Sequence, residues 1–548
     1  MADQDTPTAR RSRLQSCLHR LGDCDDKVAL AEAVRDTLAV SPPDGSSDVL
    51  DHLAQAYRRQ ADVVEEVGAR VGAVGRTHLP NVWAGQSGAG AADAVNAAAR
   101  DADHMSLAFR EAYRTLAAFA DVVHEAQATD GMGRELLFDA FRILESSDAL
   151  ADDQQGDGAG KGGGGLRKGG LSVNRQDSEA AEEALSHART AATAGAQKRL
   201  TAAAKCEEAA RVATRDLNKL TSQARAGRLR GSGLSDADAL ALADTAVAGA
   251  PRDLNKLLSA DDLDRSEQAM SRLDSDDHAE FNRMLSDAKS PEERAYLLKA
   301  LAAGNSMDAV STFQDKIHGR DPLWLRDHLS PITADSDSMK DEGLDDDGAN
   351  KNTEDVTFHG QKWEQGGDGS EGTCVASSTI TARALVDPVY ALDLTGGPSG
   401  HDENPDHFRD RLVDEQHRVH NEGDGGKNWN GMGVEGQELV DDREIGSHTG
   451  TDYDRRDLSG DDDRRAALTD VEQSVADGRP VPVNVSGSDG NHAMMIIGQE
   501  GDKLQIYNPW GTTTWVSEHD FVSGHLGGAA DSGLGDGVFA VFVPHGTG

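Results

Sequence analysis

The chain is short of cysteine, of aromatic residues and of long apolar runs. Its four cysteines in 548 residues are too few for a disulfide framework, and no pair has the spacing of metal ligands. No apolar run approaches the roughly 20 residues that span a bilayer, and the opening "MADQDTPTARRSRLQS" lacks the apolar core of a signal peptide. We therefore expect no metal site and no membrane span. We expect export, if it occurs, by a signal-peptide-independent route, and a cytoplasmic location otherwise.

Basic charge is also scarce. There are 55 Lys and Arg residues against 96 Asp and Glu, a net charge of −41. So acidic a surface repels nucleic acid and anionic lipid, which excludes both as expected partners. The length is too great for one compact core, so the sequence predicts several domains.

Two long amphipathic helices are predicted near the N-terminus, over about 48–75 and 90–127, from apolar residues at three-and-four spacing. Between them stands Trp83-Ala84-Gly85, where the glycine allows a tight turn and the tryptophan can cap the hairpin. This arrangement resembles the WXG-type helical hairpins of type VII secretion. The resemblance implies a partner in secretion machinery or another helical protein. The family's export signal is missing, since Tyr113 is followed four residues later by Ala117 rather than by an acid.

Composition divides the rest of the chain. After an N-terminal extension (1–40) and the hairpin domain (41–150), a glycine-rich stretch at 151–175 predicts a flexible linker. Residues 176–330 predict a helical spacer, with a helix starting at Ser290-Pro291, and 331–360 form an acidic linker. Residues 361–548 predict helices after Cys374 and around 404–421, then strands in "RPVPVNVSG", "HAMMIIGQ", "DKLQIYNP" and "GVFAVFVP". The predicted fold is multidomain, all-α in the N-terminal and central regions and α+β at the C-terminus.

Three residues of the last domain form a candidate catalytic set. Cys374 heads the predicted helix "VASSTITARAL", where the helix dipole lowers a thiol pKa. His492 begins one apolar strand and Asn508 ends the next, so adjacent antiparallel strands could bring imidazole and amide together. The side-chain amide of Gln365 and the Cys374 backbone N–H are candidate oxyanion donors, with Gln361 in reserve for the glutamine.

The segments "EQGGDGSEGTCVASS", "GRPVPVNVSGSDGNHAMMIIG" and "LQIYNPWGTTTWVSEHDF" resemble a papain-like cysteine peptidase of calpain-like flavour. The resemblance covers 361–548. It implies Cys374 as nucleophile, His492 as base, Asn508 as the group that orients it and Gln365 as oxyanion donor, with no cofactor and a protein or peptide substrate. Two positions depart from the family pattern: Asn491 replaces a glycine before the histidine, and Val375 follows the cysteine where tryptophan is common. The number of residues between Gln365 and Cys374 is also larger than is usual in this family.

Simpler interpretations stand beside this one. The histidines of 401–420 are expected on a polar helix face rather than around a metal, and Trp510 and Trp515 are expected to cover the His492–Asn508 pair. A delivery-type module followed by a catalytic one is also the layout of bacterial polymorphic toxins and secreted effectors, which implies a possible immunity protein. Two alternatives stay open: a deamidase, transglutaminase or acyltransferase on the same fold, and a non-catalytic binding or scaffold protein with a degenerate papain-like domain.

Overall fold

A computed structural model describes residues 7–24, 26–84, 86–153, 175–226, 257–332, 350–487, 490–526, 529 and 537–546. The chain divides into two compact units, one of residues 1–59 with 110–216 and one of residues 60–109 with 217–548. Each unit is described by itself. Most of the predicted glycine-rich linker and of the predicted acidic linker lies outside the described residues.

The first unit is a helical bundle held by small residues and one buried ion pair. It contains α1 (Pro7–Asp23), α2 (Lys27–Ala39) and α6 (Arg175–Ala226) to residue 216, with parts of α3 (Ser47–Ala73) and α5 (Gln86–Asp153). A Cβ at Gly133 of α5 would lie 2.7 Å from the Gly195 carbonyl oxygen of α6, so these backbones approach closely. One turn after Gly195 on α6, fully buried Arg199 donates to Asp130 at 2.7 Å and to the Val40 carbonyl at 2.6 Å. Cutting either partner would leave an unpaired buried charge.

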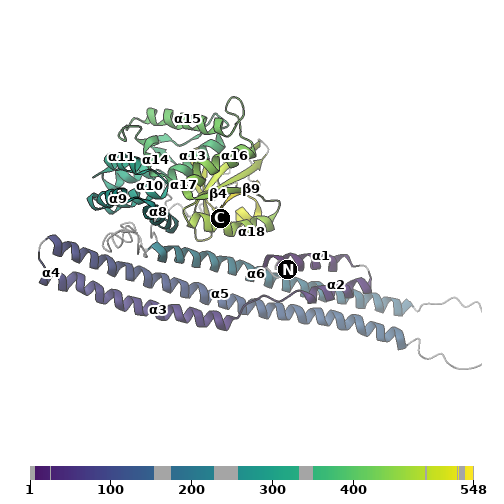
Figure 1. The fold of residues 1–548 in the computed structure, drawn as a ribbon. Helices are drawn as coiled ribbons and strands as arrows, with labels where there is room; N and C mark the ends of the chain where they lie inside the picture. Colours follow the sequence, from purple (N-terminus) through teal and green to yellow (C-terminus); the bar gives the residue numbers. More distant parts are fainter. Residues whose placement is uncertain are drawn as a thin grey trace, which may run out of the picture. The chain divides into compact units, whose positions relative to one another are not determined.

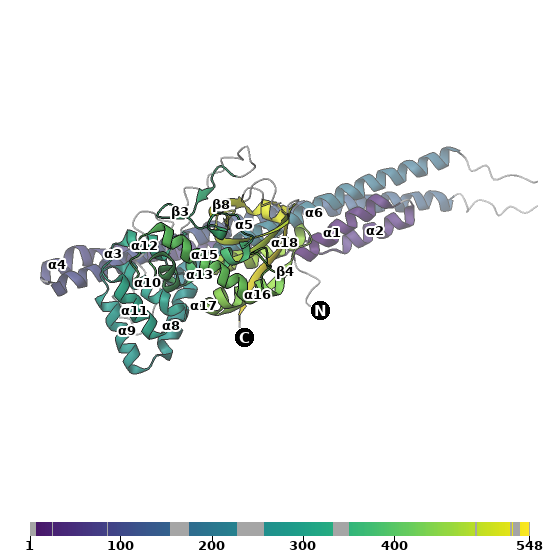
Figure 2. The same ribbon diagram turned by 90° about the horizontal axis from the view of Figure 1, so that it is seen from above.

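Helices α3 and α5 form the predicted hairpin and lie side by side (Figure 1; Figure 2 gives the view from above), with Gly68 of α3 close to Ala102 of α5. Both predicted helices are confirmed, and α5 continues well past the predicted end. Ser106 of α5 donates to the Ala61 carbonyl of α3 at 3.1 Å, a buried bond that fixes the pairing. The turn contains a π-helical segment, Val74–His78, and the short α4, Leu79–Val82. Trp83 follows α4 and is 49% exposed, so it does not pack into the hairpin as a cap.

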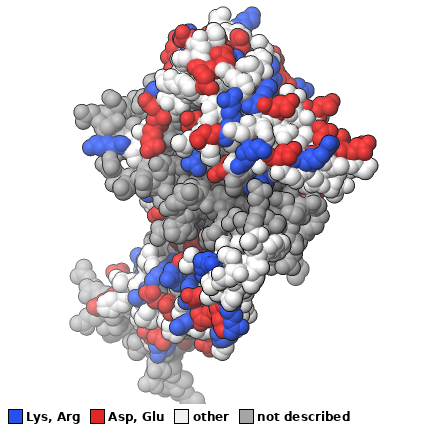
Figure 3. All heavy atoms as spheres, turned by 90° about the vertical axis from the view of Figure 1, so that its left-hand side faces the viewer, with Lys and Arg blue, Asp and Glu red and all other residues white. Residues whose placement is uncertain are grey.

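Residues 176–330, predicted as one spacer, fall into two parts of the structure. The first is α6; the second is five helices of the other unit, α8 (Ala260–Arg272), α9 (Ser275–Asp287), α10 (Pro291–Ala302), α11 (Met307–Ile317) and α12 (Pro322–Leu329). The predicted start of α10 is confirmed, since Ser290 accepts a bond from the Glu293 N–H at 3.1 Å and Pro291 occupies the first turn. Figure 3 shows acidic and basic side chains interspersed on one face of this unit, with no large area of a single sign in view.

The C-terminal part contains the predicted helices and antiparallel sheet. The helices are α13 (Cys374–Val386), α14 (Pro388–Thr395), α15 (Pro405–Glu422), α16 (Val434–Asp441), α17 (Ser447–Thr449), α18 (Asp461–Ala476) and α19 (Glu518–Ser523). A seven-stranded sheet has the order β1-β8-β7-β6-β5-β9-β4. Its strands are β1 (Glu354–Asp355), β4 (Thr451–Asp457), β5 (Val481–Gly487), β6 (Gly490–Glu500), β7 (Lys503–Asn508), β8 (Thr512–Ser517) and β9 (Gly537–Gly546), and all pairs are antiparallel. A small hairpin, β2 (Thr357–Phe358) and β3 (Gln361–Lys362), precedes α13.

Both faces of the sheet are covered. Successive residues of a strand point to opposite faces, so Ala493 and Met495 of β6 pack in one core with α13, while Met494 and Ile496 pack in another with α18. The first core contains the N-terminal end of α13, where Cys374 lies. The sheet therefore presents β6 directly to the candidate nucleophile.

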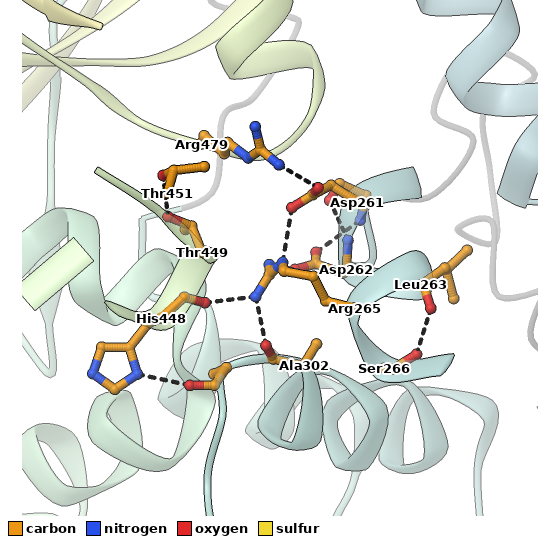
Figure 4. Close-up of polar contacts among 12 residues, drawn as sticks. Asp261, Asp262, Leu263, Arg265, Ser266, Ala302, His448, Thr449, Thr451 and Arg479 are labelled. Atoms are coloured by element: carbon orange, nitrogen blue, oxygen red, sulfur yellow. Dashed lines mark hydrogen bonds and ion pairs between the residues drawn. The ribbon is translucent and has the colours of Figure 1, made fainter. Parts of the chain in front are cut away.

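The five-helix part shares its core with the C-terminal part. Leu392 and Val389 of α14 pack in the apolar cluster of α8–α12. Figure 4 shows a polar contact between the same two parts: Arg265 of α8 donates to the carbonyls of Ala302, at 2.6 Å, and His448, at 2.5 Å. The same guanidinium pairs with Asp261 and Asp262 (Figure 4). Helices α8–α12, predicted as part of a helical spacer, are thus packed onto the C-terminal fold.

Candidate active site

Cys374 is the first residue of α13 and is half-buried. The chain reaches it through a tight approach: the Gly431 N–H donates to the Gly372 carbonyl at 2.8 Å, and a Cβ on Gly372 would lie 2.9 Å from Asn430 Oδ1. Glycine at 372 is therefore required for this approach. At the start of α13, Cys374 lies against β6, because it packs on the core that contains Ala493. Ser378, one turn further along α13, donates to the Ala493 carbonyl at 3.3 Å.

His492 and Asn508 are joined across two neighbouring strands. His492 Nε2 lies 3.0 Å from Asn508 Oδ1, and both side chains are buried. The register explains the meeting: Met495 of β6 faces Tyr507 of β7, so Asn508 falls beside Met494, two residues from His492. By strand alternation His492, Met494 and Asn508 share the face of the sheet that packs on α18, whereas Cys374 packs against the core on the other face, at the N-terminal end of α13. An amide oxygen accepts only, so the bond assigns the proton to Nε2 and leaves Nδ1 of the neutral ring with a lone pair.

The turn after β7 holds the pair from the other side. Asn508 Nδ2 donates to the Ala529 carbonyl at 2.8 Å, and the Trp510 N–H donates to Asn508 Oδ1 at 3.2 Å. The Trp510 ring lies 5.4 Å from the His492 ring, centre to centre. Trp510 therefore covers the pair as predicted. Trp515 of β8 does not, because it faces Gln505 of β7 and its ring reaches Gly498.

Gln365 lies in a short 3-10 turn, Gln365–Gly367, that is pinned to the Asn508 turn. Its backbone N–H donates to the Pro509 carbonyl at 2.7 Å, and Glu364 bridges to Trp510. The Gln365 side chain is buried, and no described residue hydrogen-bonds to its Oε1. Gln361, the reserve candidate, lies on β3 opposite Phe358. The geometry thus favours Gln365 over Gln361 as the glutamine beside the pair.

Two residues that sequence reasoning missed fix the Gln365 turn. Gln416 of α15, fully buried, accepts from the Gly366 N–H at 2.7 Å and donates to the Glu364 carbonyl at 3.0 Å. Tyr507 of β7 donates to the Trp363 carbonyl at 2.6 Å. A polar residue within an amphipathic helix is the one sequence signal for Gln416, and it did not show where the side chain points.

The electrostatics of the site favour a neutral resting pair. Burial raises the pKa of the Cys374 thiol above its usual value, although hydrogen bonds with the backbone of Ala493 and Val375 oppose the shift. Burial lowers the pKa of His492, and the bond to Asn508 partly opposes this. The shift of Cys374 is opposite to the prediction from its place at a helix N-terminus, because desolvation outweighs the helix dipole here. Thiol and imidazole are both uncharged at neutral pH in this arrangement.

The structure brings together Cys374 with the backbone beside His492, His492 with Asn508, and Gln365 with the Asn508 turn. The hydrogen bonds among the described residues do not include one between the Cys374 thiol and the His492 ring. Catalytic hydrogen bonds are often long in a substrate-free enzyme and tighten in the complex. The set thus contains the residue types of an acyl-transfer site, with the His492–Asn508 bond formed.

The polar-face expectation for the histidines of 401–420 holds for exposed His407 but not for His420, which is buried. His407 binds Asp402 at 2.9 Å, His417 binds Glu371 at 2.8 Å and stacks on Trp429, and His420 bonds the Gly426 carbonyl at 3.0 Å. These three imidazoles have different partners and share no common ligand point.

Comparison with known proteins found no match. No family model fits the chain, and no curated protein or solved structure matched it. Among the helices that the structure describes, none is long and apolar enough to cross a membrane. The argument for function therefore depends on the geometry of the site.

Proposed function

We propose that the C-terminal part is a papain-like cysteine hydrolase that cleaves an amide bond through an acyl-enzyme. The observation that carries the proposal is the His492–Asn508 bond at 3.0 Å with Cys374 held against the next residue, Ala493. A structural cysteine would not require a buried histidine of fixed tautomer next to Ala493, the β6 residue in its core. Residue types and placement match the roles of nucleophile, base and orienting amide.

The proposed reaction starts from the neutral pair. The Cys374 proton passes to His492 Nδ1 as Sγ attacks the substrate carbonyl carbon. The imidazolium then gives this proton to the departing amine as the C–N bond breaks, which leaves a thioester on Cys374. A water molecule, deprotonated by His492, attacks the thioester and releases the acid and the thiol. Asn508 holds the ring through both transfers.

The developing oxyanion needs donors near the nucleophile. The backbone N–H of Cys374, at the first turn of α13, has no partner within its own helix. The Gln365 amide is the second proposed donor, since its backbone is fixed on Pro509 and no described residue hydrogen-bonds to its side-chain oxygen. One such donor contributes about 10²–10³ in kcat in known cases.

A secreted, effector-like role for the whole chain is part of the same proposal. It is supported by the order of the parts, a helical hairpin with exposed Trp83 first and the proposed hydrolase last. Export assays of the full chain and of Trp83→Ala in a host with type VII secretion test it, because equal retention of both in the cell contradicts a role for the hairpin in export.

The test of the chemistry is a peptide-mixture assay read by mass spectrometry. The full chain and Cys374→Ala are incubated with the same peptides, with and without added amines. Cleavage products that require Cys374 support a peptidase. Ammonia release or amine incorporation that requires Cys374 indicates a deamidase or transglutaminase with the same nucleophile. No product that differs between the two proteins contradicts the proposal and favours a binding module.

A further inference from the structure

A second cluster of chemical groups lies where α12, the β2–β3 turn and the segment between α14 and α15 meet. His328, His359 and Glu403 come from these three elements, and one ligand atom from each lies within 4.8 Å of the others. His328 Nε2 lies 3.3 Å from a Glu403 carboxylate oxygen, and His359 Nε2 lies 3.2 Å from the same oxygen. The cluster contains none of the residues of the proposed active site.

These separations suit a tetrahedral metal ion. Two ligands each at 2.0–2.1 Å from zinc lie about 3.3 Å apart when the angle between them is tetrahedral. Two imidazole nitrogens and one carboxylate oxygen are also a donor set that zinc accepts. The three donors leave a fourth position, which water can fill because His359 and Glu403 are partly exposed.

One residue, Trp324, orients two of the three ligands, through its backbone carbonyl and its side chain. Its carbonyl lies 3.0 Å from His328 Nδ1, so this nitrogen carries the proton and Nε2 presents its lone pair to the cluster. Its indole Nε1–H donates to the other oxygen of Glu403 at 3.1 Å. The Trp324 ring also stacks on the His328 ring, with centres 3.9 Å apart. Outer contacts of this kind fix ring orientation in metal sites.

His328 supplies an independent sign of a missing ligand. The side chain is 1% exposed, yet its Nε2 makes no hydrogen bond of acceptable geometry with any described residue. It is aimed at Glu403 without bonding it properly. A buried polar atom left in this way costs about 1–3 kcal/mol unless something binds it.

His359 is held toward the cluster by its turn. It joins β2 to β3 with Gly360, and both residues have positive φ, 50° and 84°. This is a two-residue hairpin turn of the type that prefers Asn-Gly. Histidine at the first position is thus a costlier residue than asparagine for the backbone, and the turn itself does not require it.

From this geometry we propose that His328, His359 and Glu403 bind one divalent transition-metal ion of the zinc class. The ion ties α12 to the β2–β3 turn and to the segment before α15. The Gln365 turn follows β3 closely in the chain. The ion therefore stabilises the hairpin that leads to this turn, without contacting the residues of the proposed active site.

The experiment uses the full chain in a Cys374→Ala background, which removes the accessible thiol as a competing ligand. The protein is stripped with EDTA, desalted and titrated with Co²⁺, whose visible absorption reports tetrahedral coordination, and then with Zn²⁺ as competitor. The expected result is one Co²⁺ per chain, displaced by Zn²⁺. His359→Asn and Glu403→Gln are expected to raise the dissociation constant at least about tenfold. His359→Asn suits the turn, so loss of binding is separable from loss of folding.

A matched control is His407→Asn. It removes a histidine paired with a carboxylate, Asp402, in the same region but with no third ligand, and it is expected to leave the dissociation constant unchanged. Trp324→Phe, which keeps the carbonyl contact to His328 but loses the indole donor, is expected to weaken binding about tenfold. The proposal is overturned if the background protein takes up no metal, or if uptake is the same in His359→Asn and Glu403→Gln, in which case the cluster is a histidine–glutamate ion pair only.

Discussion

His492 Nε2 and Asn508 Oδ1 meet at 3.0 Å across β6 and β7, and this bond sets the tautomer of the imidazole. In the proposed mechanism, Nδ1 is then the atom that takes the proton from Cys374. A catalytic role for Asn508 thus acts through His492, and the following prediction tests that route.

Asn508→Ala is expected to lower kcat/KM about five- to tenfold, because a lost hydrogen bond of about 1–1.5 kcal/mol leaves the ring free to turn. Asn508→Asp keeps the acceptor but loses the donor to the Ala529 carbonyl. It is expected to retain more activity than Asn508→Ala, with a lowered free energy of unfolding. Equal activity in Asn508→Ala and the parent protein would show that the bond has no catalytic role. Steady-state kinetics with thermal unfolding separate the two effects.

The pH profile of kcat/KM should be broad. Because burial lowers the pKa of His492, the midpoint of the acid limb should lie below the ordinary histidine value of about 6.5. Because burial raises the pKa of Cys374, the midpoint of the basic limb should lie above the ordinary thiol value of about 8.5. Initial rates at low substrate between pH 4 and pH 10 measure both limbs. An acid limb above pH 6.5 would be inconsistent with a neutral resting pair.

The sequence predicted the helices and strands of the C-terminal part because the spacing of their apolar residues fits either the helical or the strand period. It predicted the His492–Asn508 pairing because His492 lies near the start of one strand and Asn508 at the end of the next, and antiparallel pairing brings these two ends together. It could not predict Gln416, because its partners, Gly366 and Glu364, are about fifty residues away and are backbone atoms. Nor could it predict the direction of the Cys374 pKa, which depends on how much protein surrounds the sulfur.

Gln416→Leu should destabilise the protein and the site together. The substitution leaves the Gly366 N–H without its acceptor, at about 1–3 kcal/mol for an unpaired buried group, and removes one of the two bonds to the Glu364 carbonyl, which keeps the Gly367 N–H. The Gln365 turn should then shift, and kcat should fall more than KM rises if Gln365 supports the transition state. Gln473→Leu on α18, whose amide reaches only a neighbouring Asp477, is the control for removing a glutamine. An unchanged kcat in a folded Gln416→Leu would remove the glutamine turn from the mechanism.

Arg265→Met tests whether α8–α12 belong to the C-terminal fold. The arginine, 12% exposed, joins Asp261 and Asp262 to the Ala302 and His448 carbonyls (Figure 4). Its loss leaves two acids and two carbonyls without that donor, so the free energy of unfolding should fall by about 2–4 kcal/mol. Arg272→Met, at the exposed end of the same helix, should change it by less than about 0.5 kcal/mol. Chemical denaturation of the full chain compares them, and equal values for the two variants would argue against the contact.

The central claim is that His492 activates Cys374, and the most direct measurement is the alkylation rate of that thiol. Cys17, Cys24 and Cys206 are buried, so iodoacetamide in native buffer should label Cys374 first, as peptide mass spectrometry can verify. At pH 7, His492→Ala should slow labelling of Cys374 at least about tenfold, because the proton of the thiol then has no base to accept it. His545→Ala, an exposed histidine on β9, should leave the rate unchanged. Equal rates in the parent protein and His492→Ala would contradict the account and leave Cys374 an ordinary half-buried cysteine.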